Sequence, residues 1–506
     1  MELTDEPTTV EFPVAGISSG RDGSTNGPAS DRAQKALWFR RRGLIAAAFV
    51  VVVASGFGAT LYLGVLDDVP LLNPAVAAAA EAAGVLALVG SWLRRDRHWL
   101  SRQLPLLLTT VTLAVVGTAG ALWITETVTD PYPPSFGLWV GSALAALVGG
   151  PSVMRRRRSG RAATARRLAA VAAVPLTLAG GLMLIDDEYG IWPQVSDVLG
   201  HTNVIDGAGL SKLLPGIGNG AKPPAPTHGS SLPAKGVMVG LDAPSPHSHF
   251  RHRPGVVYLP PAYFGPGRSK LPVLVLMVGA PGTPMNWVRA GAATKTADAY
   301  ATAHRGVSPV LVIVDQNGSA TGDTECVDGP HGNAETYMTV DVPAFITGTL
   351  GIEHDAARWG LVGFSEGGTC ALDLMLGHPD VYRHLVDLGG DAAPNLGDRQ
   401  HTLTDLFGNS VAAQRAHDMA QLLRTHHLAG TTAWLSAGIH DPGRLAIARQ
   451  IASATAKVGV ISHEFAGIAG HNWQFARDAF SRILPPLCDE MGCTSSTMKA
   501  YTSFSS

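Results

Sequence analysis

Ser365 is the residue of this sequence whose type and surroundings best suit covalent chemistry. It lies in GFSEG, residues 363–367, which fits the pattern G-x-S-x-G. An apolar run (359–362) precedes the motif and a helical pattern (369–376) follows it, so we expect the serine at a sharp turn between a strand and a helix. Side chains at positions 363 and 367 would collide with neighbouring backbone in such a turn, which explains the two glycines. We therefore predict that Ser365 is a nucleophile; the alternative is a serine in an ordinary glycine-rich turn.

A serine hydroxyl becomes a strong nucleophile only when a base takes its proton. When the nucleophile lies at a strand-to-helix turn of this kind, its partners follow in the order serine, acid, histidine. His471, in AGIAGHNWQF, follows the last predicted strand, and Asp441, in SAGIHDPG, follows the one before it. We predict His471 as the base and Asp441 as the acid that orients it; His440 could not orient an imidazolium. The alternative for Asp441 is an N-cap of the helix that begins near Arg444.

The tetrahedral oxyanion formed by serine attack needs two N–H donors placed in advance. We predict the backbone amide of Glu366, directly after the nucleophile, as one donor. The second should come from the loop VGAPGTPMNW, where Pro281 has no N–H group. Ala280 is the preferred candidate in that loop, with Gly279 or Gly282 as alternatives.

Elements that could position these residues alternate regularly after residue 235. Short apolar runs are separated by helical patterns, which predicts a largely parallel sheet with helices on both faces. The predicted strands are 236–241, 255–259, 271–278, 309–314, 359–362, 385–388, 432–436 and 458–465.

With these residues placed, residues 236–486 resemble the esterase family of α/β-hydrolases, which includes esterase D-like enzymes and actinobacterial mycolyltransferases. The resemblance rests on VVYLPPAYF, LPVLVLMVGAPG, GFSEGGTCALDL, LVDLGGDAAPN and AGHNWQFARDAF. It implies Ser365, Asp441 and His471 as a catalytic triad and Ala280 as an oxyanion donor. Many of these esterases carry His-Gly where this chain has Val278-Gly279, and mycolyltransferases carry Asp-Gly followed by an arginine-containing stretch. Trehalose mycolyl transfer is therefore not implied, although acyl transfer remains as a reaction class.

Five apolar runs occupy the first third of the chain. Each is close to the roughly 20 residues that cross a bilayer core as a helix. Arginines cluster at 40–42, 94–102 and 155–167, whereas the alternate loops 67–70 and 125–135 contain no lysine or arginine. By the positive-inside rule the N-terminus is cytoplasmic, and an odd number of spans places the C-terminal half outside. The runs are 44–66, 71–93, 104–124, 136–154 and 168–185, of which the last two are the shortest.

We therefore expect an α-helical membrane bundle of about five transmembrane helices, followed by an α/β-hydrolase domain with a mostly parallel central sheet. The expected divisions are a disordered cytoplasmic tail (1–34), a transmembrane domain (35–188), a Pro/Gly-rich linker (189–234), the esterase domain (235–487) and a flexible tail (488–506). The predicted location is the cell membrane, multi-pass, with the catalytic domain extracytoplasmic.

All four cysteines lie in the last third, which suits an oxidising compartment. Four cysteines allow three pairings, and the sequence alone does not choose among them. We favour Cys326–Cys370 with Cys488–Cys493; four free thiols are the alternative. Glu81, in the second apolar run, is either a functional intramembrane carboxylate or a carboxyl paired with a neighbouring helix.

Other features exclude several functions. The net charge is −2, so nothing in the overall charge indicates nucleic-acid binding. We expect no cofactor and no metal. The histidine-rich segment HSHFRHR lacks cysteine or carboxylate at ligand spacing, and we interpret it as a solvated connection between strands.

Two pairs of side chains have alternative roles. Asp315 and Asp323 either line a substrate cleft or cap a loop, and Trp287 and Trp473 either line an acyl site or fill the core.

The sequence thus predicts a membrane-anchored, extracytoplasmic serine esterase acting on an ester, for which a cell-envelope lipid is the favoured substrate. An acyltransferase that passes the acyl group to an envelope sugar or lipid is the first alternative. A catalytically inactive scaffold is the second. No protein partner is indicated.

Overall fold

The structure, a computed structural model, describes residues 71–92, 136–154, 160–199, 233–265 and 267–493, with residue 204 and single positions between 101 and 117. The predictions for the 1–34 tail and the 44–66 helix lie outside the described residues, as do most of those for the 104–124 helix, the 189–234 linker and the C-terminal tail.

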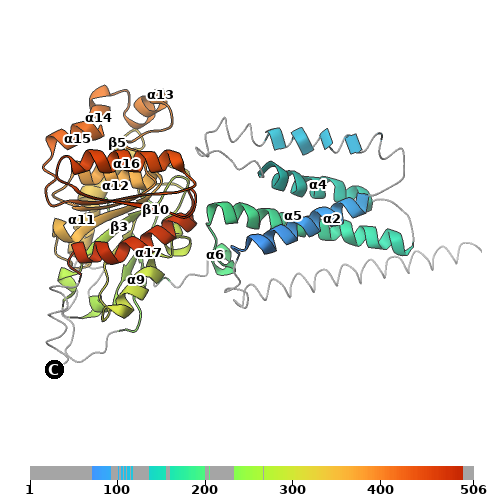
Figure 1. Cartoon of the computed structure of the whole chain (residues 1–506), viewed down its shortest axis with the longest axis horizontal. Coiled ribbons are helices and arrows are strands. Elements are labelled where there is room, and N and C mark those ends of the chain that lie inside the picture. The colour runs from blue at the N-terminus through green and yellow to red at the C-terminus, as the bar shows by residue number, and fades with distance from the viewer. Residues whose placement is uncertain are drawn as a thin grey trace, which may run out of the picture. The chain divides into compact units, whose positions relative to one another are not determined.

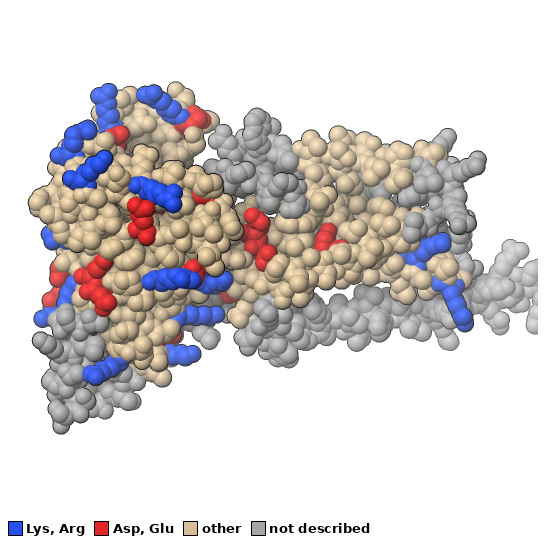
Figure 2. Space-filling view, viewed as in Figure 1, with Lys and Arg blue, Asp and Glu red and all other residues tan. Residues whose placement is uncertain are grey.

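Three apolar helices are described in the first half of the chain: α2 (Pro74–Trp92), α4 (Phe136–Met154) and α5 (Arg161–Tyr189). α2 and α4 coincide closely with the predicted runs 71–93 and 136–154, whereas α5 extends beyond the predicted run 168–185 at both ends. By length and composition, α2 and α5 could cross a membrane, whereas the apolar part of α4, Phe136–Gly150, is shorter. Their described surface is mostly uncharged in this view, apart from basic residues near one end and a few acidic residues farther along (Figure 2). The structure thus provides two candidate spans, and a bundle of five stays a prediction.

Glu81 of α2 is paired with a neighbouring helix. Ser142 of α4 donates a hydrogen bond to its carboxylate. Gly180 of α5 lies so close that a Cβ there would be 2.5 Å from the Glu81 backbone nitrogen. Small residues commonly allow such close approach between membrane helices. The paired interpretation of Glu81 is the one that these contacts support.

The C-terminal half is built on an eight-stranded sheet in the order β1-β2-β4-β3-β7-β8-β9-β10. β1 and β4 both pair with β2 in antiparallel fashion, and all the later neighbours are parallel. This is the mostly parallel sheet of an α/β-hydrolase, as predicted. The strands are β1 (Val237–Leu241), β2 (Gly255–Leu259), β3 (Val273–Met277), β4 (Val310–Ile313), β7 (Trp359–Phe364), β8 (His384–Leu388), β9 (Thr432–Gly438) and β10 (Ile461–Gly467).

Helices cover both faces of this sheet (Figure 1). On one face lie α12 (Glu366–Gly377) and α16 (Pro442–Ala456), and on the other lie α9 (Ala293–Ala303) and α17 (Trp473–Glu490). The central strands are buried along their whole length, which explains their continuous apolar sequences. Because these strands are parallel, their carboxyl ends all lie at one edge of the sheet, where the loops after β3, β4, β7, β9 and β10 converge.

The two tryptophans belong to the core. Trp287 is fully buried, donates its indole N–H to the Met277 carbonyl oxygen over 2.7 Å, and meets Trp473 edge to face at 5.3 Å between ring centroids. The core-packing alternative for these residues is confirmed.

Three local expectations need correction. β10 begins at Ile461 rather than at residue 458, because a turn with Gly459 at φ +92° precedes it. A small hairpin of β5 (Asp328–Gly329) and β6 (Gly332–Asn333) was not predicted, since two residues carry no periodicity. The segment 247–253 is not simply solvated: Ser248 and Phe250 are buried, and His247 Nδ1 lies 2.8 Å from Asp341 Oδ1.

Candidate active site

Ser365 occupies a strained turn between β7 and α12. Its φ of 59° and ψ of −125° lie in a region that non-glycine residues rarely adopt. A Cβ at Gly363 would overlap the Gly367 carbonyl group, and one at Gly367 would lie 2.5 Å from the Met277 carbonyl oxygen. The collision predicted for side chains at both positions is therefore confirmed. The Ser365 N–H donates to the Leu388 carbonyl oxygen over 3.0 Å, which ties the turn to the neighbouring strand β8.

His471 lies in the loop between β10 and α17, within hydrogen-bond distance of the serine. Its Nε2 is 2.9 Å from Ser365 Oγ. The imidazole packs against the ring of Phe364, with 5.0 Å between centroids, and its side chain is 13% exposed. A neutral imidazole in this position can accept the hydroxyl proton through Nε2.

Asp441 lies where both of its predicted roles are geometrically possible. Its Oδ1 accepts a hydrogen bond from the Arg444 N–H over 3.1 Å and so caps α16. Its Oδ2 faces His471 Nδ1 at 3.6 Å, beyond ordinary hydrogen-bond length. Such contacts are often long before substrate binds and tighten in the complex. His440, next to it in sequence, is exposed.

The two candidate oxyanion donors, Glu366 and Ala280, line the same cavity as the serine. Glu366 is the first residue of α12, and the first N–H groups of a helix have no acceptor within it. Ala280 borders the same cavity as Ser365, and a Cβ on Gly279 would come within 2.8 Å of Ser365 Cβ. The Gly282 N–H donates to the Ala320 carbonyl oxygen over 2.9 Å, which makes Gly282 the weaker alternative.

A cavity of about 690 Å³ opens beside Ser365. Its described lining includes one arginine, Arg444, together with His331 and His401. The remaining ionisable groups on its wall are carboxyls: Asp323, Glu325, Glu366, Asp391 and Asp405. The described lining of the cavity therefore contains more acidic than basic side chains.

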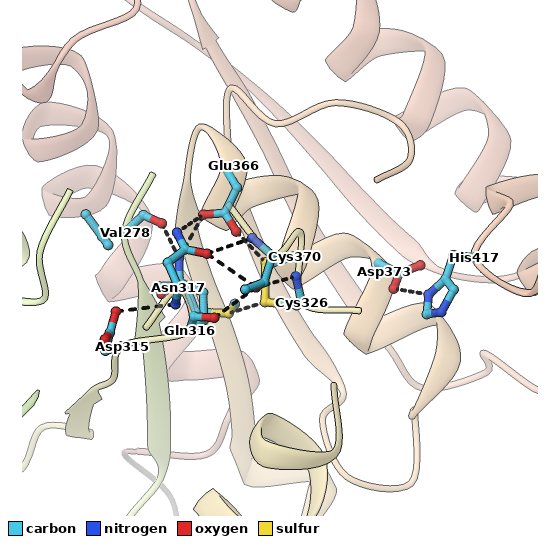
Figure 3. Close-up of a disulfide and its surroundings, with 11 residues drawn as sticks. Val278, Asp315, Gln316, Asn317, Cys326, Glu366, Cys370, Asp373 and His417 are labelled. Atoms are coloured by element: carbon cyan, nitrogen blue, oxygen red, sulfur yellow. Dashed lines mark hydrogen bonds and ion pairs between the residues drawn. A yellow bond between two sulfur atoms is a disulfide. The ribbon is translucent and has the colours of Figure 1, made fainter. Parts of the chain in front are cut away.

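The side chain of Glu366 is buried in a polar nest (Figure 3). Gln316 Nε2 and Asn317 Nδ2 donate to its Oε2 over 2.8 and 3.0 Å. A sulfur of the disulfide Cys326–Cys370 lies 3.1 Å from its other oxygen. Burial raises the pKa of Glu366 well above its usual range.

Burial has the same effect on its acidic neighbours. It raises the pKa of Asp323 to about 6 and that of Glu325 well above its usual range. Asp387, at the end of β8, accepts a hydrogen bond from the Gly390 N–H over 2.7 Å, and burial raises its pKa to about 7.

Sequence reasoning missed the acidic side chains of Glu325, Glu366 and Asp387. One signal was available for Glu325. It precedes Cys326, and Cys370 follows Glu366 by one helical turn, so accepting that disulfide brings the two glutamates together.

Asp323 lines the cavity, which was one of the two roles predicted for it. Asp315 is buried and forms an ion pair with Arg253 at 2.6 Å. Among the described residues, one group of potential metal ligands is close enough to hold an ion: Cys326, Glu366 and Cys370. Its two cysteines form a disulfide and offer no thiolate. The second favoured pair, Cys488–Cys493, is also a disulfide.

Comparisons with known proteins match the C-terminal half of the chain. Residues 248–487 match the family described as "Putative esterase". An uncharacterized protein of Corynebacterium glutamicum is 35% identical over 240 residues, which are 46% of this chain and 56% of that relative. The match thus spans little more than half of the relative's length.

Among the solved structures that are similar to this chain, two cover about half of its length. An S-formylglutathione hydrolase from Agrobacterium tumefaciens is 18% identical, with 53% of this chain and 99% of that one covered and a TM-score of 0.42. A ferulic acid esterase is 17% identical, with 51% and 98% covered and a TM-score of 0.39.

Proposed function

We propose, from the membership of residues 248–487 in the esterase family, that this protein is a serine hydrolase that cleaves a carboxylic ester. The observation that carries the proposal is the 2.9 Å contact between Ser365 Oγ and His471 Nε2 at a strained turn beside a cavity.

The geometry supports a two-step reaction. Ser365 Oγ attacks the ester carbonyl while His471 Nε2 takes the hydroxyl proton, and Asp441 stabilises the imidazolium that forms. The N–H groups of Glu366 and Ala280 stabilise the oxyanion. Collapse of the intermediate breaks the ester C–O bond, and His471 returns its proton to the departing alcohol. A water molecule, deprotonated by His471, then attacks the acyl-serine. Collapse of this second intermediate breaks the bond between the acyl carbon and Ser365 Oγ, His471 returns the proton to Oγ, and the acid is released.

We further propose that the enzyme is anchored in the membrane and acts outside the cytoplasm on an envelope lipid. The lengths and composition of α2 and α5 support an anchor, and the arginines at 161, 166 and 167 against Asp186–Glu188 give α5 the expected charge asymmetry. A tether needs fewer helices than this, so we expect the helices also to help present a membrane-embedded substrate. The same acyl-enzyme could pass its acyl group to an alcohol, and access of water to the acyl-serine decides between hydrolysis and transfer.

Fluorophosphonate labelling of the full-length protein in membranes tests the central claim. We expect labelling of the wild type and none of Ser365→Ala or His471→Ala, with Ser481→Ala, an exposed serine, as the labelled control. A folded wild type that is not labelled would contradict the proposal and favour the inactive scaffold.

A second measurement tests the anchor. The domain cut at about residue 230 and the full-length protein are compared on native lipid extracts, with and without added glycerol as an acceptor. Equal turnover by both would show that the helices do not present substrate, and acyl-glycerol as the main product would favour the transferase.

A further inference from the structure

The C-terminal end of α5 contacts the hydrolase domain, and both belong to one compact unit of the chain. Ile191, two residues after the helix, packs against the main core of that domain. The Gly190 N–H donates to the Asp186 carbonyl oxygen and Gly190 has a φ of 68°, so the helix ends there in a left-handed turn. A Cβ on Gly190 would lie 3.1 Å from Gln474 Cγ, so this turn lies directly against the first turn of α17.

Two side-chain amides at the start of α17 complete the last turn of α5. Asn472 Nδ2 donates to the Glu188 carbonyl oxygen over 3.0 Å. Gln474 Nε2 donates to the Asp187 carbonyl oxygen, also over 3.0 Å. The last carbonyl groups of a helix have no partner within it, so these amides act as a cap supplied by another helix. We call the contacts of residues 187–190 with residues 472–474 the α5–α17 junction.

The junction directly follows His471 in sequence. The histidine belongs to the short connection 468–472 between β10 and α17. On the N-terminal side of the histidine, a backbone N–H of the loop that carries Asp441 donates to the Ala469 carbonyl oxygen over 3.3 Å. On its C-terminal side, Asn472 joins the connection to α5. The connection is therefore held at one end by the loop of the acid and at the other end by α5.

The position of the imidazole decides whether it can act as a base. His471 Nε2 lies 2.9 Å from Ser365 Oγ, and proton transfer requires such hydrogen-bond distance. Gly470, directly before the histidine, lies in open space, where a Cβ would meet no atom within 4 Å, so side-chain packing does not fix the backbone there. A misplacement of about 1 Å can cost about 100-fold in rate. A contact that fixes residue 472 therefore acts on the reaction through His471.

We propose that Asn472 and Gln474 are positioning residues that hold His471 through the end of α5, so that the membrane anchor completes the active site. The proposal rests on the ester-cleaving function and on the anchoring by α5 proposed above. It gives the anchor a role beyond tethering, because the catalytic base is held in place only while α5 is docked.

The junction can be loosened from the α17 side without loss of the helix cap. Asn472 Oδ1 caps α17 by accepting the Phe475 N–H over 3.0 Å, and serine caps a helix about as well but is too short to reach α5. In Asn472→Ser/Gln474→Met, α17 therefore keeps its cap and its buried Trp473. We expect kcat of the full-length protein in detergent for ethyl butyrate to fall about 10- to 100-fold at unchanged KM. Asp418→Ser, which exchanges the cap of α15 (Met419–Thr425), is the control and should keep the wild-type kcat.

The junction can also be loosened from the α5 side, with His471 and its neighbours intact. In Gly190→Ala the new Cβ presses on Gln474, and the φ of 68° disfavours a side chain. We expect the same fall in kcat at unchanged KM. Combining Gly190→Ala with Asn472→Ser/Gln474→Met should add little, because both changes remove the same contacts. Gly160→Ala is the control: Gly160 caps the other end of α5 at a φ of 117°, and a Cβ there would meet no atom within 4 Å.

Hydrogen–deuterium exchange of the same proteins separates this proposal from the esterase function. In the α17-side and α5-side variants, the backbone amides of residues 468–474 should exchange about tenfold faster or more, while wild-type protection of β7 shows that the domain is folded. Wild-type kcat in either variant, or unchanged exchange at residues 468–474, would overturn the proposal. If the wild type hydrolyses no ester, the esterase function fails, whereas faster exchange in both variants still supports the hold of α5 on His471.

Discussion

The two flanks of Ser365 differ in burial, in rigidity and in the groups that they carry. On one side, the histidine flank consists of His471 and Asp441, which are partly exposed and lie 3.6 Å apart. On the other, the carboxyl flank consists of Glu325 and Glu366, which are buried. Glu325 directly precedes Cys326 and Glu366 lies one helical turn before Cys370, so a single disulfide connects their two segments.

This difference follows from what each flank has to do. A general base must exchange protons with substrate and water, so it needs access and some freedom to move. Buried carboxyl groups instead act through fixed position and low local polarity, which strengthen electrostatic interactions. We infer that the histidine flank supplies the chemistry, whereas the carboxyl flank holds the loop after β4 against the start of α12.

The largest expected effect lies on the histidine flank. His471→Ala should lower kcat for 4-nitrophenyl butyrate by about 10⁴-fold or more, because the serine loses its base. His440→Ala, an exposed histidine in the loop of Asp441, is the matched control and should keep wild-type activity. Turnover by His471→Ala above about a hundredth of the wild-type rate would remove this residue from the base role.

The disulfide of the carboxyl flank should stabilise the domain more than the C-terminal one. The bridges join residues 44 and 5 positions apart, and chain entropy predicts about 4 and about 2 kcal/mol for them. Urea unfolding of Cys326→Ala/Cys370→Ala and of Cys488→Ala/Cys493→Ala, followed by tryptophan fluorescence, compares the two. Equal losses would mean that the bridge of the carboxyl flank does not confer the extra stability.

Asp387, another buried carboxyl, should make the unfolding free energy of the domain depend on pH. Because burial raises its pKa to about 7, the stability that this group contributes is fully present below about pH 4 and is lost as the pH rises through about 7. Relative to Asp387→Asn, wild type should therefore lose up to about 4 kcal/mol of unfolding free energy between pH 4 and pH 8. Parallel unfolding curves of the two proteins across this range would contradict the burial effect, and Asp380→Asn, an exposed carboxyl, serves as the control.

The smallest expected effects distinguish the two roles of Asp441, which are to orient His471 and to cap α16. Asparagine can still cap α16, so Asp441→Asn should lower kcat about 100-fold through loss of the charge next to His471, at unchanged melting temperature. Asp441→Ala should show the same kinetic loss and also about 1 kcal/mol of destabilisation. Asp418→Ala removes the equivalent cap of α15 (Met419–Thr425) and should destabilise without a kinetic effect. If Asp441→Asn kept full activity, Asp441 would be a helix cap alone.

The sequence by itself determined the eight strands, the turn at Ser365 and the candidates His471 and Asp441. These features depend on local rules: apolar runs bounded by turns, glycines at a tight bend, and the order of loops along a parallel sheet. Each rule acts over a few residues or over the regular succession of strands, so it can be read without coordinates.

The burial of the carboxyl flank was decided by tertiary structure. Glu325 and Glu366 are far apart in sequence and meet only because the loop after β4 folds onto the start of α12 and is bonded there by Cys326–Cys370. Burial, the loss of hydrogen-bond partners and the raised pKa values then arise from atoms contributed by several loops at once. No local pattern encodes such a meeting, because its energy depends on desolvation by residues distant in the chain.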